Sequence, residues 1–186
     1  MVKQIVMLLV LAAAAAVAQT PAAAPSPQSA PAPAASMPEA TAQDVDTIDH
    51  VVAALYDVIS GPPGPRDWNR FKSLFIAEAR LIPNGVRDGA AFHRVLTVDE
   101  FAQRSGQSGM QNGFFENETA RKQERFGGIA HVFSTYESRR EKGGQPFAKG
   151  INSIQLLWDG KRWYIVTVLW DSERPDNPIP AEYQKK

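Results

Sequence analysis

The sequence contains no cysteine, so the chain can form no disulfide and can offer no thiolate to a metal or a substrate. It also has no excess charge, because 20 Lys and Arg side chains balance 20 Asp and Glu side chains. A chain without a basic field has little attraction for nucleic acid or for anionic lipid. We therefore expect neither as a partner, and we expect stability to come from the apolar core alone.

Motifs for metal, phosphate or nucleophilic chemistry are missing as well. Neither His50 nor His93 has a second ligand at helical or strand spacing, so no histidine-based metal site is expected. The chain has no glycine-rich phosphate loop, no nucleophile elbow and no Ser/His/Asp pattern. The sequence accordingly predicts no metal and no cofactor.

The N-terminal residues have the pattern of a secretory signal peptide. Lys3 is followed by an apolar run from Ile5 to Val17, and the run ends in the small residues Ala16-Val17-Ala18. A membrane-spanning helix is the alternative, but the second half of the run is mostly alanine and too weakly apolar. We expect residues 1–18 to be removed after Ala18 and the protein to be exported, to the bacterial periplasm or into the medium, with no membrane contact afterwards.

A segment rich in Ala, Pro, Ser and Gln follows, over residues 19–45, with prolines at 21, 25, 27, 31, 33 and 38. Such a composition buries too little apolar surface to offset the entropy of ordering the chain. We expect a disordered spacer; the alternative is a docking site for a partner with an aromatic groove. The remaining residues, 46–186, have the length of one domain.

Three helices are expected in the first half of this domain. Apolar residues at three-and-four spacing predict a helix over 48–59, capped by Asp46 or Thr47, and a second stripe over 68–75 follows a cap at Asp67. A brief strand at 81–82 and an extended segment at 92–96 come next. Residues 97–100 form a capping box that opens a third helix to about residue 104, and the glycine-rich run 105–113 is expected to be a loop.

The second half reads as strands over 114–126, 129–139, 147–158 and 161–171. Gly127-Gly128 and Asp159-Gly160 separate two pairs of them, and such dipeptides favour hairpins because type I′ turns need positive φ. Helices first and a four-stranded antiparallel meander afterwards predict an α+β fold, in which helices pack on one face of a curved sheet.

The chain resembles the SnoaL-like branch of the nuclear-transport-factor-2-like superfamily. The resemblance covers residues 46–173 and lies in Arg66-Asp67-Trp68 before a Phe-rich helix, in the strand from Gly128 to Glu137 (GIAHVFSTYE), and in the closing hairpin from Trp158 to Ile165 (WDGKRWYI). It implies a cone-shaped cystatin-like roll with a pocket at its open end, often dimeric through the sheet. The superfamily includes ketosteroid isomerases, dehydratases and cyclases, and such likeness transfers no chemistry by itself.

Hairpin geometry predicts which residues share the concave face. If Gly127-Gly128 is the turn, that face carries Thr119, Arg121, Gln123, Ala130, Val132, Ser134 and Tyr136, and Glu118 and His131 lie outside. The turn at Asp159-Gly160 groups Asn152, Ile154 and Leu156 with Trp163, Ile165, Thr167, Leu169 and Asp171. A slip of one residue would invert either set.

The candidate ligand-binding residues follow from these faces: Tyr56, Arg121, Ser134, Tyr136, Asn152, Thr167 and Asp171. In an apolar cavity Asp171 would be a general acid or base, and otherwise it pairs with Arg121 or stays in water. In the ketosteroid isomerases a first-helix tyrosine stabilises an oxyanion, so Tyr56 would donate there; otherwise its ring only packs. Arg121 either clamps a carboxylate ligand or pairs across the sheet. His131, opposite Glu124, is expected in a cross-strand pair or a dimer contact.

Three functions remain open. The preferred hypothesis is an exported domain that binds a small hydrophobic or carboxylate-bearing ligand in an apolar pocket. The second is a cofactor-independent isomerase, dehydratase or cyclase that uses Asp171 and Tyr56, so the question of catalysis stays open. The third is a homodimeric interaction module, in which the sheet face with Phe133 and His131 forms the interface.

Overall fold

The computed structural model describes residues 37–184, so the expected signal peptide (1–18) and most of the expected spacer (19–45) lie outside the described residues. The last part of that spacer belongs to the packed domain. Residues Ala42–Val45 form helix α1, and Val45 is 2% exposed. Met37 and Ala40 also pack against the core, so ordered structure begins before the expected boundary at residue 46.

The helix signals in the sequence are confirmed at their N-termini. Thr47 caps α2 (Ile48–Ile59), and Asp67 caps α3 (Trp68–Ser73), each by accepting a hydrogen bond from a backbone N–H three residues on. The capping box of Thr97 and Glu100 opens α4 (Val98–Gln111). None of these helices is long and apolar enough to cross a membrane, a statement that covers residues 37–184.

The expected loop over 105–113 is wrong, because α4 continues through it to Gln111. Two glycines there lower helix propensity, but each makes a tertiary contact, a close approach at Gly106 and a backbone hydrogen bond at Gly109. A Cβ on Gly106 would lie 3.1 Å from the indole nitrogen of Trp68, and the carbonyl of Gly109 accepts from the backbone N–H of Gly64 at 3.0 Å. Tertiary contacts therefore override the local preference of these glycines.

The strands form one mixed, seven-stranded sheet in the order β2-β1-β7-β6-β5-β4, with β3 paired to β1. The meander of the last four strands is confirmed, whereas the brief strand expected at 81–82 is part of a 13-residue strand that pairs in parallel with β7. The bounds are β1 Phe75–Arg87, β2 Ala90–His93, β3 Leu96–Thr97, β4 Phe115–Phe126, β5 Ile129–Arg139, β6 Pro146–Trp158 and β7 Trp163–Ser172.

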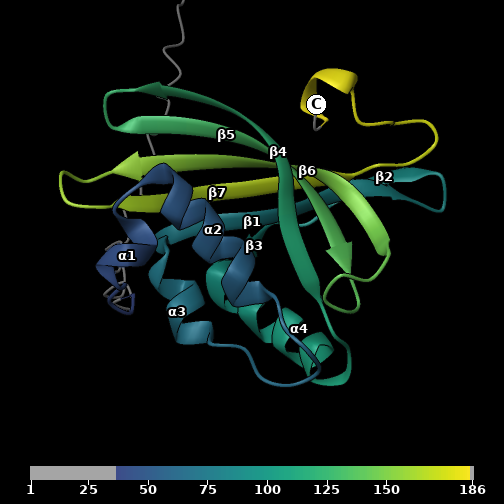
Figure 1. Ribbon diagram of the computed structural model, residues 1–186, viewed down its shortest axis with the longest axis horizontal. Helices are drawn as coiled ribbons and strands as arrows, with labels where there is room; N and C mark the ends of the chain where they lie inside the picture. Colours follow the sequence, from purple (N-terminus) through teal and green to yellow (C-terminus); the bar gives the residue numbers. More distant parts are fainter. Residues whose placement is uncertain (1–36, 185–186) are drawn as a thin grey trace, which may run out of the picture. The chain divides into compact units, whose positions relative to one another are not determined.

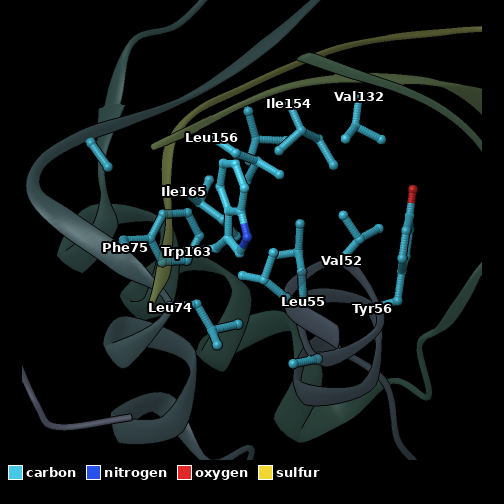
Figure 2. Close-up of a cluster of buried hydrophobic side chains, with 14 of the residues drawn as sticks. Val52, Leu55, Tyr56, Leu74, Phe75, Val132, Ile154, Leu156, Trp163 and Ile165 are labelled. Atoms are coloured by element: carbon cyan, nitrogen blue, oxygen red, sulfur yellow. The ribbon is translucent and has the colours of Figure 1, made fainter. Parts of the chain in front are cut away.

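The sheet curves over the helices, which gather on its concave side (Figure 1). Side chains of α2 face those of the central strands, and Figure 2 shows Val52 and Leu55 pointing toward Ile154, Leu156 and Ile165. All five are buried, and burial of such a side chain contributes roughly 1.5–3 kcal/mol. This arrangement confirms the expected α+β class.

The register of the first hairpin is as predicted near the turn and differs beyond it. Phe126 opposes Ile129 and Arg121 opposes Ser134, but Thr119 is an extra residue, so that Glu118 rather than Thr119 opposes Tyr136. A β-bulge of this kind turns the remainder of the strand over. The prediction that Glu118 lies on the outer face is therefore wrong, and Glu116, two residues before it, also lies on the concave face.

The second hairpin contains a comparable irregularity. Trp158 opposes Trp163, so the turn has four residues rather than two, and Val166 is an extra residue between the pairs Leu156–Ile165 and Gln155–Thr167. The concave face consequently continues with Val168 and Trp170. The prediction that Thr167, Leu169 and Asp171 share the concave face with Asn152 is wrong, since the bulge at Val166 turns them outward.

Candidate functional site

A pocket of about 240 Å³ lies between the helices and the concave face of the sheet. Helices α2, α3 and α4 form one side of it, and strands β1, β4, β5, β6 and β7 contribute to the other. Its wall includes six aromatic side chains, and its polar side chains come from the sheet, from α4 with its C-cap and from two arginines. The lining residues are Leu55, Ile59, Arg66, Trp68, Phe71, Leu81, Phe101, Ser105, Ser108, Gly109, Asn112, Phe114, Glu116, Tyr136, Arg140, Asn152, Val168 and Trp170.

Four of the aromatic rings contact one another in series along the wall. The ring centroids of Trp68 and Phe71 are 5.4 Å apart, those of Phe71 and Phe101 5.3 Å, and those of Phe101 and Trp170 6.1 Å. Edge-to-face and stacked pairs at these separations are favourable and hold each ring in place. The pocket thus has a preformed aromatic wall suited to a flat apolar molecule.

Glu116 is the acidic side chain of the pocket. The hydroxyl of Ser138 donates to its carboxyl at 2.7 Å. Among residues 37–184 it forms no ion pair. Burial raises the pKa of Glu116, and hydrogen bonds from Ser138 and Asn152 offset that effect only in part. A carboxyl group in these surroundings can hold a proton and donate it in a hydrogen bond.

A chain of hydrogen bonds leads away from the pocket behind Asn152. Its amide Nδ2 donates to the Tyr56 hydroxyl at 3.0 Å, and that hydroxyl lies 2.7 Å from Oγ of Ser134. The Ser134 hydroxyl donates in turn to the carboxylate of Glu118. Because the one proton of the Ser134 hydroxyl goes to Glu118, the Tyr56 hydroxyl donates to Ser134 Oγ. Burial raises the pKa of Tyr56, so this hydroxyl stays protonated.

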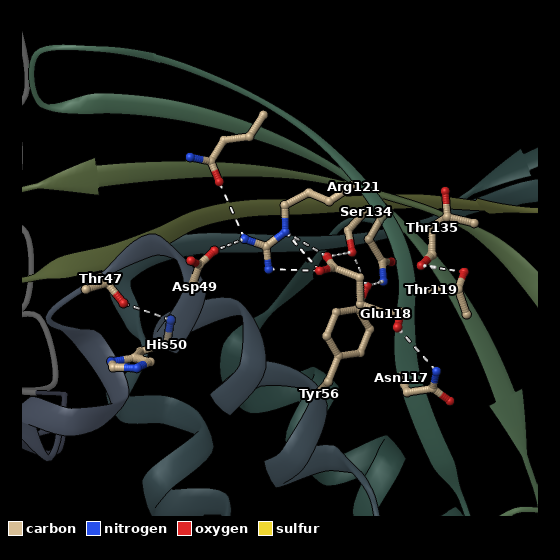
Figure 3. A network of polar contacts seen from close by, with 12 residues as sticks. Thr47, Asp49, His50, Tyr56, Asn117, Glu118, Thr119, Arg121, Ser134 and Thr135 are labelled. Carbon is tan, nitrogen blue, oxygen red and sulfur yellow. Dashed lines mark hydrogen bonds and ion pairs between the residues drawn. The ribbon is translucent and has the colours of Figure 1, made fainter. Parts of the chain in front are cut away.

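This series of hydrogen bonds ends in an ion-pair cluster at the surface (Figure 3). Arg121 donates from Nε to both oxygens of Glu118, at 2.9 and 3.0 Å, and from Nη1 to Asp49 of α2 at 2.5 Å. Two carboxylates therefore neutralise Arg121, but the expected pairing across the sheet is wrong, because Glu118 lies on the same strand and Asp49 on α2. Arg121 does not line the pocket.

Asp171 and Tyr56 do not share a cavity. Asp171 lies on the outer face, where Arg174 donates to its Oδ1 at 2.7 Å, and it borders a separate shallow hollow together with Ile179 and Tyr183. Thr167 also lies on the outer face, opposite Gln155. Of the seven candidate residues, the structure brings four together: Tyr136 and Asn152 in the pocket wall, with Tyr56 and Ser134 directly behind them.

Two arginines at the pocket were not among the sequence candidates. Arg66 donates to the backbone carbonyls of Ile59, Gly61, Pro62 and Gly64 at 2.8–3.2 Å, and so holds the loop between α2 and α3 in place. Arg140 lies with its guanidinium 4.2 Å from the ring centre of Phe147. Within residues 37–184 neither arginine forms an ion pair with an acidic side chain.

The sequence signal for Glu116 was weak, because only the bulge at Thr119 places it on the concave face.

Among the described residues, no group of three or more His, Asp and Glu side chains comes together in a way that could hold a metal ion.

Comparison with known proteins identifies the fold. A protein of unknown function from Nostoc punctiforme, described as having a cystatin-like fold, matches at 12% identity and a TM-score of 0.54, over 74% of this chain and 96% of that one. A variant of a Mycobacterium tuberculosis protein of unknown function matches at 14% identity and a TM-score of 0.54, over 72% and 75%. The chain has a cystatin-like α+β fold.

An NTF2-like protein of unknown function from Silicibacter pomeroyi matches more loosely, at 15% identity and a TM-score of 0.43, over 68% of this chain and 99% of that one. No family model matches the sequence, and no curated protein matches it. At these identities the structural likeness concerns the fold, so the chemistry has to come from the pocket.

Proposed function

We propose that this protein binds a small, largely apolar molecule in the pocket between the helices and the concave face of the sheet. The observation that carries the proposal is the pocket itself, with an aromatic wall and a small number of polar side chains, among them Glu116, Arg66 and Arg140. Binding sites commonly combine a mostly apolar wall with few polar groups that orient the ligand. Cystatin-like neighbours support the architecture, and the motifs from Gly128 to Glu137 and from Trp158 to Ile165 support the SnoaL-like branch.

Blocking the pocket tests this function. Ser105 lines the pocket on α4, whereas Gln107 on the same helix is exposed and does not line it. A thermal-shift and calorimetric screen against hydrophobic acids and steroids should find compounds that stabilise the wild type. Ser105→Trp should abolish their binding, and Gln107→Trp should leave it unchanged. If no compound stabilises the wild type, or if the two variants bind alike, the proposed site is wrong.

A second candidate function is cofactor-independent proton transfer, and Glu116 is the observation in its favour. The carboxyl lines the pocket and its pKa is raised, and Tyr136, whose hydroxyl pairs with Ser172 at 3.2 Å, lies in the same wall. The version that relies on Asp171 and Tyr56 lacks a common cavity. Turnover of enolisable ketones should then be lost in Glu116→Gln and retained in Asp171→Asn; the reverse order of effects would refute this assignment.

Homodimerisation through the outer face of the sheet is the third candidate. His131 lies opposite Glu124 there and contacts Ser153 at 3.0 Å. The C-terminal segment covers the neighbouring Phe133, since the rings of Phe133 and Tyr183 are 5.0 Å apart. A dimer through this face would therefore have to include or displace that segment. A monomer at micromolar concentration, by light scattering, would refute it.

We further propose that the protein is exported and acts in the periplasm or outside the cell. The charged, apolar and small-residue order of residues 1–18 supports this address. The mature protein from a bacterial expression host should begin at Gln19, as intact mass and N-terminal sequencing would establish. Retention of Met1 in the exported fraction would contradict the proposal.

A further inference from the structure

The pocket wall contains one acidic side chain, Glu116, and two arginines, Arg66 and Arg140. The arginines lie at the end of the pocket away from Glu116. Arg140 and Phe114 lie just past the ends of β5 and β4, two residues beyond Ser138 and Glu116. With about 3.3 Å per residue in a strand, this step separates the two pairs of backbone positions by roughly 7 Å. The pocket therefore has a positive end near Arg140 and a carboxyl group at Glu116, one such step further along the sheet.

The charges at the positive end are not neutralised by the described residues. Arg66 uses its N–H groups on backbone carbonyls, which leaves its charge in place, and Arg140 stacks on the ring of Phe147 without an ion pair among residues 37–184. A guanidinium group suits a carboxylate, which it binds through two parallel hydrogen bonds. Because Arg140 is exposed and its side chain is long, it can turn toward a carboxylate at the pocket mouth.

The end of the pocket at Glu116 favours a ligand oxygen that accepts a hydrogen bond over a second charged group. Ser138 occupies one oxygen of Glu116, and the groups that surround the carboxyl are the uncharged Asn152, Tyr136 and Tyr56. The polar residues that α4 and its C-cap add to the pocket wall, Ser105, Ser108 and Asn112, are also uncharged. Glu118 on the same strand is already paired with Arg121. A protonated Glu116 in this setting donates to a ligand oxygen, whereas an ionised one repels an anion.

We propose that the ligand is a small aromatic acid with a carbonyl oxygen, which can only accept a hydrogen bond, across the ring from its carboxylate. The carboxylate binds at Arg140 within the field of Arg66, the ring lies along the wall of Trp68, Phe101 and Trp170, and the far oxygen accepts from protonated Glu116. This inference rests on the proposed binding function and specifies its ligand class. The pocket volume of about 240 Å³ agrees with a ligand of one or two rings, because drug-sized ligands use about 300–1,000 Å³.

Binding of such an anion is coupled to a proton on Glu116. The affinity of the wild type should fall as pH rises through the pKa of Glu116 in the free protein, approaching tenfold for each pH unit. In Glu116→Gln the amide keeps a donor without titrating, so the affinity should stay constant over the same pH range. Calorimetry in two buffers of different ionisation enthalpy should show uptake of up to one proton on binding to the wild type.

The experiment uses 4-acetylbenzoate, whose ketone oxygen only accepts hydrogen bonds, with the uncharged 4-acetylbenzamide and the cation tyramine as comparison probes. Isothermal titration calorimetry should give binding of the acid, which Arg140→Gln weakens about tenfold. Arg104→Gln removes an exposed charge on α4 that does not line the pocket, and should leave the affinity unchanged. The uncharged amide should bind at least tenfold more weakly than the acid, and tyramine should not bind.

The outcomes separate this inference from the function on which it rests. Equal binding of acid and amide, or an affinity unaffected by Arg140→Gln, would overturn the ligand class, while loss of binding in Ser105→Trp would still uphold the pocket. Binding of tyramine in preference to the acid would show that Glu116 acts as an anion and would also overturn the proposal. If neither these probes nor the wider screen binds, both the ligand class and the binding function fail.

Discussion

The hydroxyl of Tyr56 is the central link between the pocket and the surface ion pairs, and its removal tests that chain directly. Tyr56 is 5% exposed, and its hydroxyl has two partners, Asn152 and Ser134. Tyr56→Phe keeps the ring in place and leaves both partners buried without their shared hydroxyl. A buried group that loses its partner costs about 1–3 kcal/mol, so we expect a loss of roughly 2–3 kcal/mol in the free energy of unfolding.

This loss should be visible in both thermal and chemical denaturation. For a domain of this size, about 1 kcal/mol corresponds to roughly 2–4 °C in Tm, so Tm should fall by about 4–12 °C. Urea unfolding followed by circular dichroism should show a lower midpoint with an unchanged slope. Tyr183→Phe is the matched control, because its ring packs on Phe133 and no side-chain hydrogen bond of its hydroxyl occurs among residues 37–184.

Two results would refute this account of the network. One is a Tyr56→Phe protein within about 0.5 kcal/mol of the wild type, which is the range expected for surface substitutions. The other is simple additivity in a double-mutant cycle with Ser134→Ala. Since the two hydroxyls are 2.7 Å apart, their effects should be coupled by about 1 kcal/mol.

Three further predictions concern glycines and an ion pair. In Gly150→Ala the new Cβ would overlap the backbone of the neighbouring strand, so we expect a loss above about 3 kcal/mol by urea unfolding; near-wild-type stability would contradict this. In Gly109→Ala the nearest atom to the new Cβ is 3.9 Å away, so the helix should gain about 0.5–1 kcal/mol, and a loss would show that the pocket wall does not tolerate it. Arg70 binds Asp44 through two nitrogens, at 2.8 and 2.9 Å, and lowers the pKa of Asp44. The stability that Asp44 contributes is therefore present above the usual aspartate pKa of about 3.9. It is lost as pH falls through the lowered pKa. Asp44→Asn should therefore cost about 1–2 kcal/mol at pH 7 and progressively less in acid, more than Asp57→Asn, whose side chain is 69% exposed; a cost independent of pH would refute this linkage.

Local signals in the sequence were sufficient for most of the secondary structure. The caps at Thr47, Asp67 and Thr97 depend on a side chain and a backbone group three residues apart, and the turn at Gly127-Gly128 depends on its own dihedral preferences. Such interactions act within a few residues and are visible in the order of amino acids. The α+β class and the meander of the last four strands follow from them.

The composition of the pocket depended on contacts between distant residues. The bulges at Thr119 and Val166 each add one residue to a strand. No glycine or turn dipeptide at either position predicts them. Since side chains alternate between faces, one extra residue exchanges inside for outside. This is why Asp171, a reasonable candidate from the sequence, lies on the outer face with Arg174, whereas Glu116 lines the pocket.

The sequence by itself determined the elements, their order and the neutral, cysteine-free character of the chain. It also predicted Ser134 and Asn152 on the concave face, and both are buried there. Only the tertiary structure decided which acid would join them, since the packing of a curved sheet against α2, α3 and α4 fixes where a strand must take up an extra residue. The same packing keeps Gly106 and Gly109 helical and closes the aromatic wall around the carboxyl group of Glu116.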